Sequence, residues 1–133
     1  MIVKVVAALV KNGDKYLIAR RNHGDPEANG KWEFPGGKIE ENESEFDAVV
    51  REMREEFEIE VKPIEYLCNN ISEYTARTIE LRLYLCEFIS GEFKLHAHHE
   101  YKWVTLDELT SYDFAPADIP LAEEVVKMEK HNV

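Results

Sequence analysis

Residues 36–59 read GGKIEENESEFDAVVREMREEFEI, a double glycine followed by a segment rich in glutamate. Through its second half, apolar residues recur at steps of three and four, namely Phe46, Val49, Val50, Met53 and Phe57. At 3.6 residues per turn, this spacing predicts a helix with one apolar stripe that faces the core. A polar pair before it, either Asn42 with Glu45 or Ser44 with Asp47, supplies the expected N-cap.

Three glutamates of the predicted helix, Glu52, Glu55 and Glu56, fall within an arc of roughly 100° beside the apolar stripe. Like charges this close repel one another, and Arg51 offsets part of the repulsion if it pairs with Glu55 four residues later. A solvated helix face is the commoner interpretation of such a pattern. The alternative is an acidic cluster at the edge of the core, where a cleft can form.

The double glycine before the helix favours the second interpretation. Gly36 and Gly37 follow an aromatic-Pro turn, and glycine lets the backbone approach a ligand closely and aim a carbonyl at it. Three carboxylates and a carbonyl form a set of hard oxygen ligands of the kind that Mg²⁺ binds. The pattern therefore predicts a magnesium site, in which the cation offsets the repulsion between the glutamates.

The whole chain has the composition of a globular domain. Its 133 residues are 44% hydrophobic, so we expect one domain over residues 1–133. A formal net charge of −11 argues against binding to nucleic acid polymers or anionic membranes, which need a basic surface. Cys68 and Cys86 lie in apolar runs without an export signal, which favours reduced thiols and a cytoplasmic protein.

The remaining pattern alternates strands and helices. Strands over residues 3–10 and 15–19 flank a hairpin turn at Asn12-Gly13-Asp14, and residues 20–31 form a loop rich in Gly, Asn, Asp and Pro. Further strands are expected over 64–68, 77–89 and 101–104, and helices over 106–109 and 121–130. The fold class is therefore a mixed α/β (α+β) domain.

One motif in these residues resembles a known family. Gly37, five residues, Glu43, seven residues and then REMREE over 51–56 resemble the Nudix box of the Nudix hydrolases. The flanking KWEFPGGKIE and YDFAPADIP are similar to the MutT-like branch and, within it, to the CTP pyrophosphohydrolases. The resemblance implies an α/β/α sandwich with a mixed sheet. It also implies hydrolysis of a nucleoside triphosphate to the monophosphate and pyrophosphate with Mg²⁺, or with Mn²⁺.

The resemblance also implies roles for the residues of the box. Glu55 and Glu56 would hold the metal with the carbonyl of Gly36 or Gly37, while Glu52 is either a further metal ligand or the catalytic base. Arg51 is expected to orient its neighbours. Glu43 either adds a water-mediated metal contact or stabilises the helix N-terminus by its charge. Catalytic roles therefore fall on Glu52, Arg51 and Glu55.

The chain departs from the family pattern at two positions. Glu58 stands where the box has a glycine that commonly ends the helix in the left-handed conformation, which costs a non-glycine residue about 1–2 kcal/mol. In the loop after Gly91, the position of a frequent metal-binding glutamate aligns with Ala97, which leaves Glu100 as the candidate metal ligand. The HAHH run in this loop is either a metal site or a solvated loop.

Substrate contacts are expected from residues outside the helix. Arg21 is the candidate phosphate contact, with Arg20 as an alternative surface residue and Lys38 as a second anion contact. Phe34 and Phe114 either stack on the base or belong to the core.

Asp118, in the APAD segment, is the candidate base-reading residue. In MutT proteins that resemble this chain, an Asn stands there where 8-oxoguanine is read. An ionised Asp only accepts hydrogen bonds, so it suits the N4 amine of cytosine and favours CTP and dCTP. A buried, protonated Asp118 would donate and readmit 8-oxo-dGTP, which ranks second.

Other functions within the family are also considered. A nucleoside diphosphate sugar or a dinucleotide is a less favoured substrate, given the DFAPAD segment and the compact length. A nucleotide-binding module without hydrolysis would be expected to lose one of the three glutamates, and all three are present. The protein is expected to be a monomer or a homodimer.

Overall fold

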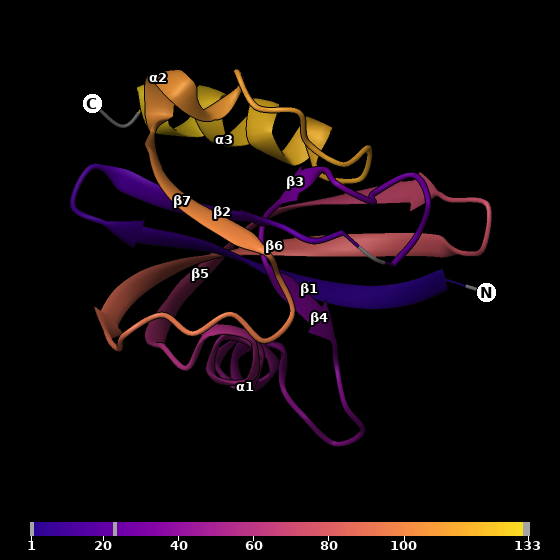
Figure 1. Ribbon diagram of the computed structural model, residues 1–133, viewed down its shortest axis with the longest axis horizontal. Coiled ribbons are helices and arrows are strands. Elements are labelled where there is room, and N and C mark those ends of the chain that lie inside the picture. Colours follow the sequence, from indigo (N-terminus) through magenta and orange to yellow (C-terminus); the bar gives the residue numbers. More distant parts are fainter. Residues whose placement is uncertain (1, 23, 132–133) are drawn as a thin grey trace.

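The computed structural model describes residues 2–22 and 24–131 as three layers around a sheet. Helix α1 (Glu45–Phe57) covers one face, whereas α2 (Leu106–Leu109) and α3 (Ile119–His131) cover the other (Figure 1). This arrangement confirms the α/β/α sandwich. In the described part of the chain, no helix has the length and apolar character that crossing a membrane requires.

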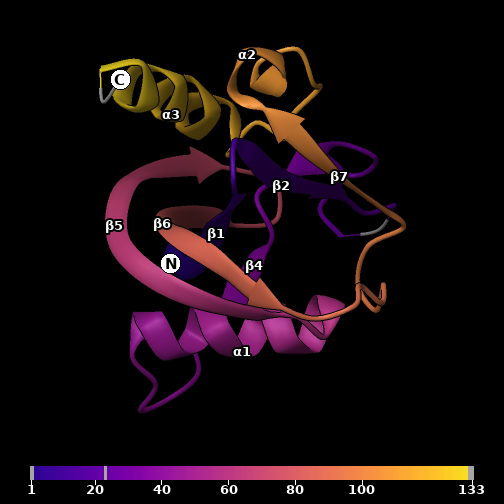
Figure 2. The ribbon, with the colours of Figure 1, turned by 90° about the vertical axis from the view of Figure 1, so that its left-hand side faces the viewer.

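The sheet is mixed, as expected. Its strands are β1 (Ile2–Asn12), β2 (Lys15–Arg20), β3 (Trp32–Glu33), β4 (Gly36–Lys38), β5 (Glu60–Glu73), β6 (Thr78–Ser90) and β7 (Glu100–Thr105). The order along the sheet is β3-β2-β1-β6-β5, with β4 paired to β1 and β7 to β2. Only the β1–β6 pair is parallel among the described strands. Figure 2 shows β5 arching from the α1 side of the sheet to the α3 side.

Alternation along β1 divides the core between the two faces. Val6, Ala8 and Val10 pack in the cluster under α1, whereas Ala7 and Leu9 pack in the cluster under α2 and α3. Neighbouring residues of a strand point to opposite faces, and all five are fully buried. Both helix layers are therefore held by the same central strand.

The predicted stripe of α1 is correct in its middle and wrong at its start. Val49, Met53 and Phe57 are at most 1% exposed. Phe46, in contrast, is 42% exposed and packs edge-on against Tyr84, because the first turn of the helix lies at the margin of the sheet. The buried arc is rotated instead to include Ala48 and Glu56, which brings one of the three glutamates into the interior.

The helix ends agree with the sequence at both sides. Of the two possible caps, Ser44 is the one formed, since its hydroxyl accepts a hydrogen bond from the Asp47 N–H at 3.1 Å. At the other end, Glu58 adopts the left-handed conformation, with φ 59° and ψ 37°. The expectation that Glu58 occupies the left-handed C-cap position is confirmed.

The strands agree less well at their ends. Sequence patterns did not predict β3 and β4, because two or three residues are too few for a periodic signal. Strand β5 is much longer than the expected 64–68, since polar residues such as Asn69 continue the pairing with β6. The short helix over 106–109 is confirmed, and residues 21–22 and 24–31 lie outside the strands, as expected for a loop.

Candidate functional site

The two glycines of β4 bring the backbone against α1. Register pairs join Gly36 to Ala7 and Gly37 to Val6 of β1. A Cβ added to Gly36 would overlap the carbonyl oxygen of Val6, and one added to Gly37 would overlap the carboxylate of Glu52. Glycine is therefore required at position 36, where the clash is with backbone, whereas a side chain at position 37 would displace the Glu52 carboxylate that lies directly beside the Gly37 backbone.

Arg51 gathers the carboxylates on the solvent side of this contact. It reaches Glu43 with two nitrogens, at 2.7 and 2.9 Å, and Glu52 at 3.0 Å. The predicted pair with Glu55 is confirmed at 3.2 Å. Nη2, one of the two nitrogens that reach Glu43, also donates to the backbone carbonyl of Lys38 at 2.9 Å, which ties the helix to β4. We call this group the outer cluster: Arg51, Glu40, Glu43, Glu52 and Glu55.

A second arginine gathers a largely buried group around Glu56, one helical turn beyond Glu52. Nη2 of Arg21 lies 2.9 Å from Glu33 Oε2 and 3.2 Å from Glu56 Oε2. Nε2 of His98 lies 2.9 Å from the same oxygen of Glu33 and 3.2 Å from Arg21 Nη2. We call this group the inner cluster: Arg21, Glu33, Glu56 and His98. Glu33 and His98 were not among the residues that sequence reasoning assigned to the site.

Burial changes the acidity of the carboxyl groups that the helix contributes. Glu56 is 6% exposed, and burial raises its pKa to about 8, with the charges of Glu33 and Glu52 adding to the shift and Arg21 opposing it. Burial also raises the pKa of Glu52, with the nearby charge of Glu55 in the same direction and Arg51 opposing. Two helix carboxyls therefore resist ionisation unless a positive charge approaches.

Glu33 behaves in the opposite way although it is also buried. Burial raises its pKa, but the hydrogen bond from His98 and the charge of Arg21 together lower it below the ordinary value. Glu33 is thus the ionised member that anchors Arg21. No motif pointed to it, because a single Glu between aromatic residues carries no spacing signal; the burial of His98 within the HAHH run was equally hidden.

The residues present fit a divalent cation. Oε1 of Glu56 is buried and has no hydrogen-bond partner, which leaves a carboxylate oxygen available as a ligand. The Gly37 backbone lies beside Glu52, and all these donors are hard oxygens. No three His, Cys, Asp or Glu side chains converge on one point in residues 2–22 and 24–131. The glutamates pair instead with the arginines of the two clusters.

A pocket of about 190 Å³ opens next to the inner cluster. Its wall includes Arg21, Gly37 and Lys38 together with Phe34 and Asp118. The structure thus brings the predicted phosphate contacts and the predicted base-reading residue into one cavity.

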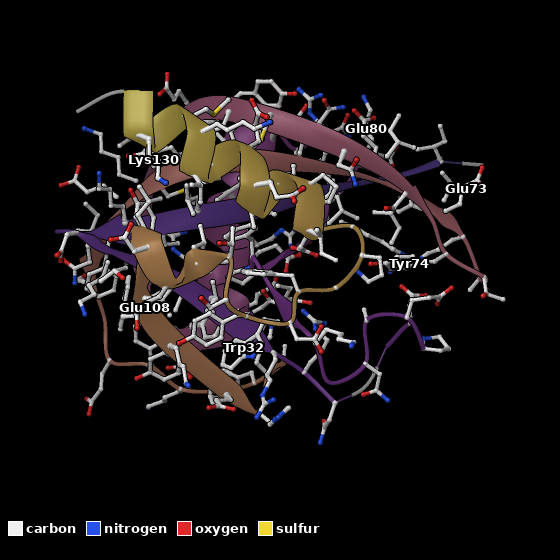
Figure 3. All side chains as sticks on the ribbon, turned by 90° about the horizontal axis from the view of Figure 1, so that it is seen from above. Trp32, Glu73, Tyr74, Glu80, Glu108 and Lys130 are labelled. Atoms are coloured by element: carbon white, nitrogen blue, oxygen red, sulfur yellow. The ribbon has the colours of Figure 1, made fainter. Side chains whose placement is uncertain are left out.

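Tyr74 closes one side of this pocket. Its hydroxyl accepts a hydrogen bond from the Ala117 N–H at 3.1 Å, which holds the turn after β5 against the segment that carries Asp118. Figure 3 shows Trp32 near the α2 end and Tyr74 near the α3 end of the connection between these helices. The backbone of Trp32 is bridged to Phe114 of that connection. The segment 113–118 is therefore fastened at both ends.

Asp118 is buried at 4% exposure, and one of its oxygens accepts a hydrogen bond from the Phe34 N–H at 2.9 Å. Burial, and next the charge of Glu33, raises its pKa well above the ordinary value. The surroundings therefore shift Asp118 toward the neutral acid, the alternative that readmits 8-oxo-dGTP. A neutral carboxyl both donates and accepts.

The other predicted residues lie as follows. Phe34 and Phe114 are both core residues with ring centroids 5.2 Å apart, and Phe34 also lines the pocket. Glu100 pairs with Arg20 at 2.6 Å across β7 and β2, and the structure does not bring it to the helix glutamates. Glu58 carries exposed ion pairs, to His96 at 2.6 Å and to Lys94 at 3.8 Å.

Comparison with known proteins places this site in a family. The model of the NUDIX domain matches residues 1–125 of the chain. The chain belongs to the Nudix family. Hydrolases of this family generally depend on a divalent metal, which agrees with the oxygen ligands described above.

Several Nudix relatives are similar over nearly their whole length. A CTP pyrophosphohydrolase of Escherichia coli K12 is 39% identical over 122 residues, which are 92% of this chain and 90% of the relative. An 8-oxo-dGTP diphosphatase of the same organism is 29% identical over 95% of this chain and 98% of the relative. The solution structure of the E. coli ORF135 protein is 37% identical, with a TM-score of 0.85, covering 98% of this chain and 92% of that one.

Proposed function

We propose that the protein is a metal-dependent nucleoside triphosphate pyrophosphohydrolase that favours CTP and dCTP over other nucleotides. The observation that supports this proposal is the continuous wall of one pocket, from Arg21 and Gly37 beside the acidic helix to Asp118. A nucleotide needs a positively charged contact for its triphosphate and a base-reading residue within one site, and this pocket contains both candidates. The 39% identity to a CTP pyrophosphohydrolase supports the choice of base.

The helix glutamates hold the cation in this proposal. Glu52, Glu55 and Glu56 supply carboxylates, and Gly36 or Gly37 supplies a carbonyl, for Mg²⁺ or Mn²⁺. A bound divalent cation offsets charge on the phosphates and activates water near neutral pH. Glu100 remains a candidate ligand only if its pair with Arg20 opens.

The side chains around these ligands have supporting roles. Arg51 holds Glu52 and Glu55 in position by hydrogen bonds of 3.0 and 3.2 Å. Glu52, half-buried and with a raised pKa, is also the candidate base that takes the proton of the attacking water. Arg21 and Lys38, which line the pocket, contact the phosphates.

Asp118 reads cytosine through the oxygen that accepts from the Phe34 N–H, which also accepts from the N4 amine of the base. This contact needs no carboxyl proton, so both the neutral and the ionised form of Asp118 make it. Phe34 itself lines the pocket and packs on Phe114.

The second candidate substrate is 8-oxo-dGTP. The same neutral carboxyl donates to O6 of an oxidised guanine, so the raised pKa of Asp118 specifically favours this alternative. The 29% identity to an 8-oxo-dGTP diphosphatase points in the same direction. If the enzyme accepts both bases, the other contacts around the Asp118 carboxyl determine which nucleotide has the higher kcat/KM.

A nucleotide panel tests the proposal. Pyrophosphate release is measured from CTP, dCTP, 8-oxo-dGTP, UTP and GTP, with Mg²⁺, with Mn²⁺ and with EDTA. We expect the highest kcat/KM for CTP or dCTP and no turnover with EDTA. Orthophosphate as the product, or nucleotide binding without any turnover, would reject the proposed reaction. Size-exclusion chromatography with light scattering distinguishes the monomer from the homodimer.

A further inference from the structure

The loop between β6 and β7 is fastened to two elements of the site. The His96 N–H donates to the carbonyl of Glu56 at 3.1 Å, in the last turn of α1. The His99 N–H donates to the carbonyl of Arg20 at 3.0 Å, at the end of β2. Residue 98, between these anchors, is therefore held where α1 and β2 approach each other.

The His98 side chain fills this position completely. Its side chain is 0% exposed, although the neighbouring His96 and His99 are exposed. The ring stacks on Phe57, with centroids 5.0 Å apart and an interplanar angle of 10°. Because the ring is stacked on Phe57, its rotation is restricted, and Nε2 is held toward the inner cluster.

The hydrogen atoms of the inner cluster can be assigned from its contacts. Nη2 of Arg21 carries two hydrogens, and these go to Glu33 at 2.9 Å and Glu56 at 3.2 Å. Neither is left for His98, so the 2.9 Å contact between His98 Nε2 and Glu33 requires the hydrogen on Nε2. Nδ1 is buried without a partner, which suits a lone pair better than an N–H group.

We propose that His98 is a positioning residue, which donates to Glu33 and thereby holds Arg21 between Glu56 and the nucleotide pocket. The proposal rests on the proposed function at one point, the phosphate contact of Arg21. His98 itself does not line the pocket wall described above and acts through Glu33.

The arrangement of Glu33 explains why this donation matters. A single oxygen, Oε2, accepts from both Arg21 and His98. A buried carboxylate that loses one of its donors is poorly compensated and turns toward the neutral form. Arg21 would then lose its pair with Glu33 and keep only its pair with Glu56. Its guanidinium group would no longer be held in the position that faces the pocket.

Three variants isolate the hydrogen bond. His98→Phe keeps the ring stacked on Phe57 but removes the donor, and His98→Gln restores a donor because its amide nitrogen reaches the place of Nε2. His99→Phe is the matched control, since His99 is exposed in the same loop. Thermal denaturation first establishes that each variant is folded.

The first measurement needs no nucleotide. In ¹⁵N–¹H spectra, the guanidinium signals of Arg21 should be separate in the wild type, because Nη2 is held by two carboxylates. We expect them to merge in His98→Phe and to stay separate in His98→Gln and His99→Phe. Glu33→Gln, which leaves the loop untouched, should merge them as well and serves if His98→Phe does not fold. Separate signals in both His98→Phe and Glu33→Gln would overturn the proposal.

The second measurement concerns the nucleotide. We expect His98→Phe to weaken the binding of α,β-methylene-CTP about tenfold, the usual range for loss of a positioning partner in such sites. KM for CTP should rise by more than kcat falls, and His98→Gln should recover most of the loss. Absence of binding in the wild type would reject the proposed function but leave the Arg21 spectra as the test of His98.

A double-mutant cycle completes the test. If His98 acts through Glu33, His98→Phe should change affinity less than about twofold in a Glu33→Gln background, because linked residues are not additive. Additive losses, or equal losses in His98→Phe and His99→Phe, would show that the loop has only a structural role.

Discussion

The two arginine clusters at the acidic face of α1 have the same chemistry and different surroundings. Arg51 and Glu55 of the outer cluster meet at 3.2 Å with the glutamate side chain 59% exposed. Arg21 and Glu56 of the inner cluster meet at the same 3.2 Å with the glutamate side chain 8% exposed. Distance alone therefore does not distinguish them.

Solvent decides what each pair contributes. An exposed ion pair is worth about 0–1 kcal/mol, because water screens it. A buried pair stabilises little on balance, but removing one partner is costly. The exposed Arg51–Glu55 pair thus contributes little to stability, whereas the inner cluster holds Glu56, whose pKa burial raises to about 8. We infer that the inner cluster responds most strongly to a divalent cation.

The largest expected difference between the clusters is in activity. Glu56→Gln keeps the shape of the side chain and removes one carboxylate, so kcat should fall at least about 100-fold, beyond the usual effect of outer-shell changes. Glu40→Gln is the matched control, because Glu40 also pairs with an arginine but is 61% exposed. Steady-state pyrophosphate release measures both. Near wild-type turnover of Glu56→Gln at saturating Mg²⁺ would refute the ligand role.

The next difference is in stability against pH. The pKa of Glu56 in the folded protein, about 8, lies above its ordinary value of 4.5. Its contribution to stability is therefore present below pH 4.5 and is lost as pH rises toward about 8, because the unfolded chain releases the proton first.

Urea unfolding without metal, at pH 5 and pH 8, measures this loss. Between these values, the wild type should lose on the order of 2 kcal/mol more than Glu56→Gln. If the two proteins lose the same free energy of unfolding between pH 5 and pH 8, the buried carboxyl of Glu56 is already ionised. The two clusters would then not differ in this respect.

A third prediction extends the contrast to Asp118, the other buried carboxyl of the pocket. Ionisation removes its donor, so the kcat/KM ratio of CTP to 8-oxo-dGTP should rise with pH in the wild type. Asp118→Asn keeps a donor at every pH and should show a constant ratio. The difference should reach about 1–3 kcal/mol, the worth of a good base contact.

Asp113→Asn is the control for this series, since Asp113 is exposed and pairs with Lys31. Parallel pH profiles for the wild type and Asp118→Asn would show that Asp118 does not read the base. In that case, the DFAPAD segment would be a structural connection only.

The smallest effect is expected at the end of the helix that carries both clusters. Glu58→Gly relieves the left-handed backbone but removes exposed pairs with His96 and Lys94, so stability should rise by at most about 1 kcal/mol. Glu58→Ala loses the pairs and keeps the strain, so it should be less stable than Glu58→Gly. A lower melting temperature for Glu58→Gly than for Glu58→Ala would contradict this account.

The layers of the fold could be predicted from the sequence because they depend on periodic patterns. The stripe of Val49, Met53 and Phe57 and the alternation along β6 each repeat a local rule. Phe46 was misplaced because periodicity gives the direction of a side chain but not where the sheet ends. Strand β4 was missed because its three residues are held by pairing with β1, a contact distant in sequence.

The site could be predicted where a motif contains it. The glutamates and glycines of the box are close in sequence, and Glu52 and Gly37 do meet in the structure. Glu33 and His98 are 65 residues apart, and only the fold brings them to Arg21. The protonation of Asp118 likewise depends on its burial near Glu33, which no local pattern of the APAD segment records.

The most direct test of the account is a calorimetric titration of the metal-free protein with Mn²⁺ or Mg²⁺ at pH 7, in two buffers of different ionisation enthalpy. If Glu56 holds a proton that the cation displaces, the wild type should release close to one proton per bound ion, and Glu56→Gln should bind more weakly with clearly less release. Glu40→Gln should match the wild type. Tight binding by Glu56→Gln with undiminished proton release would contradict the central role of the inner cluster.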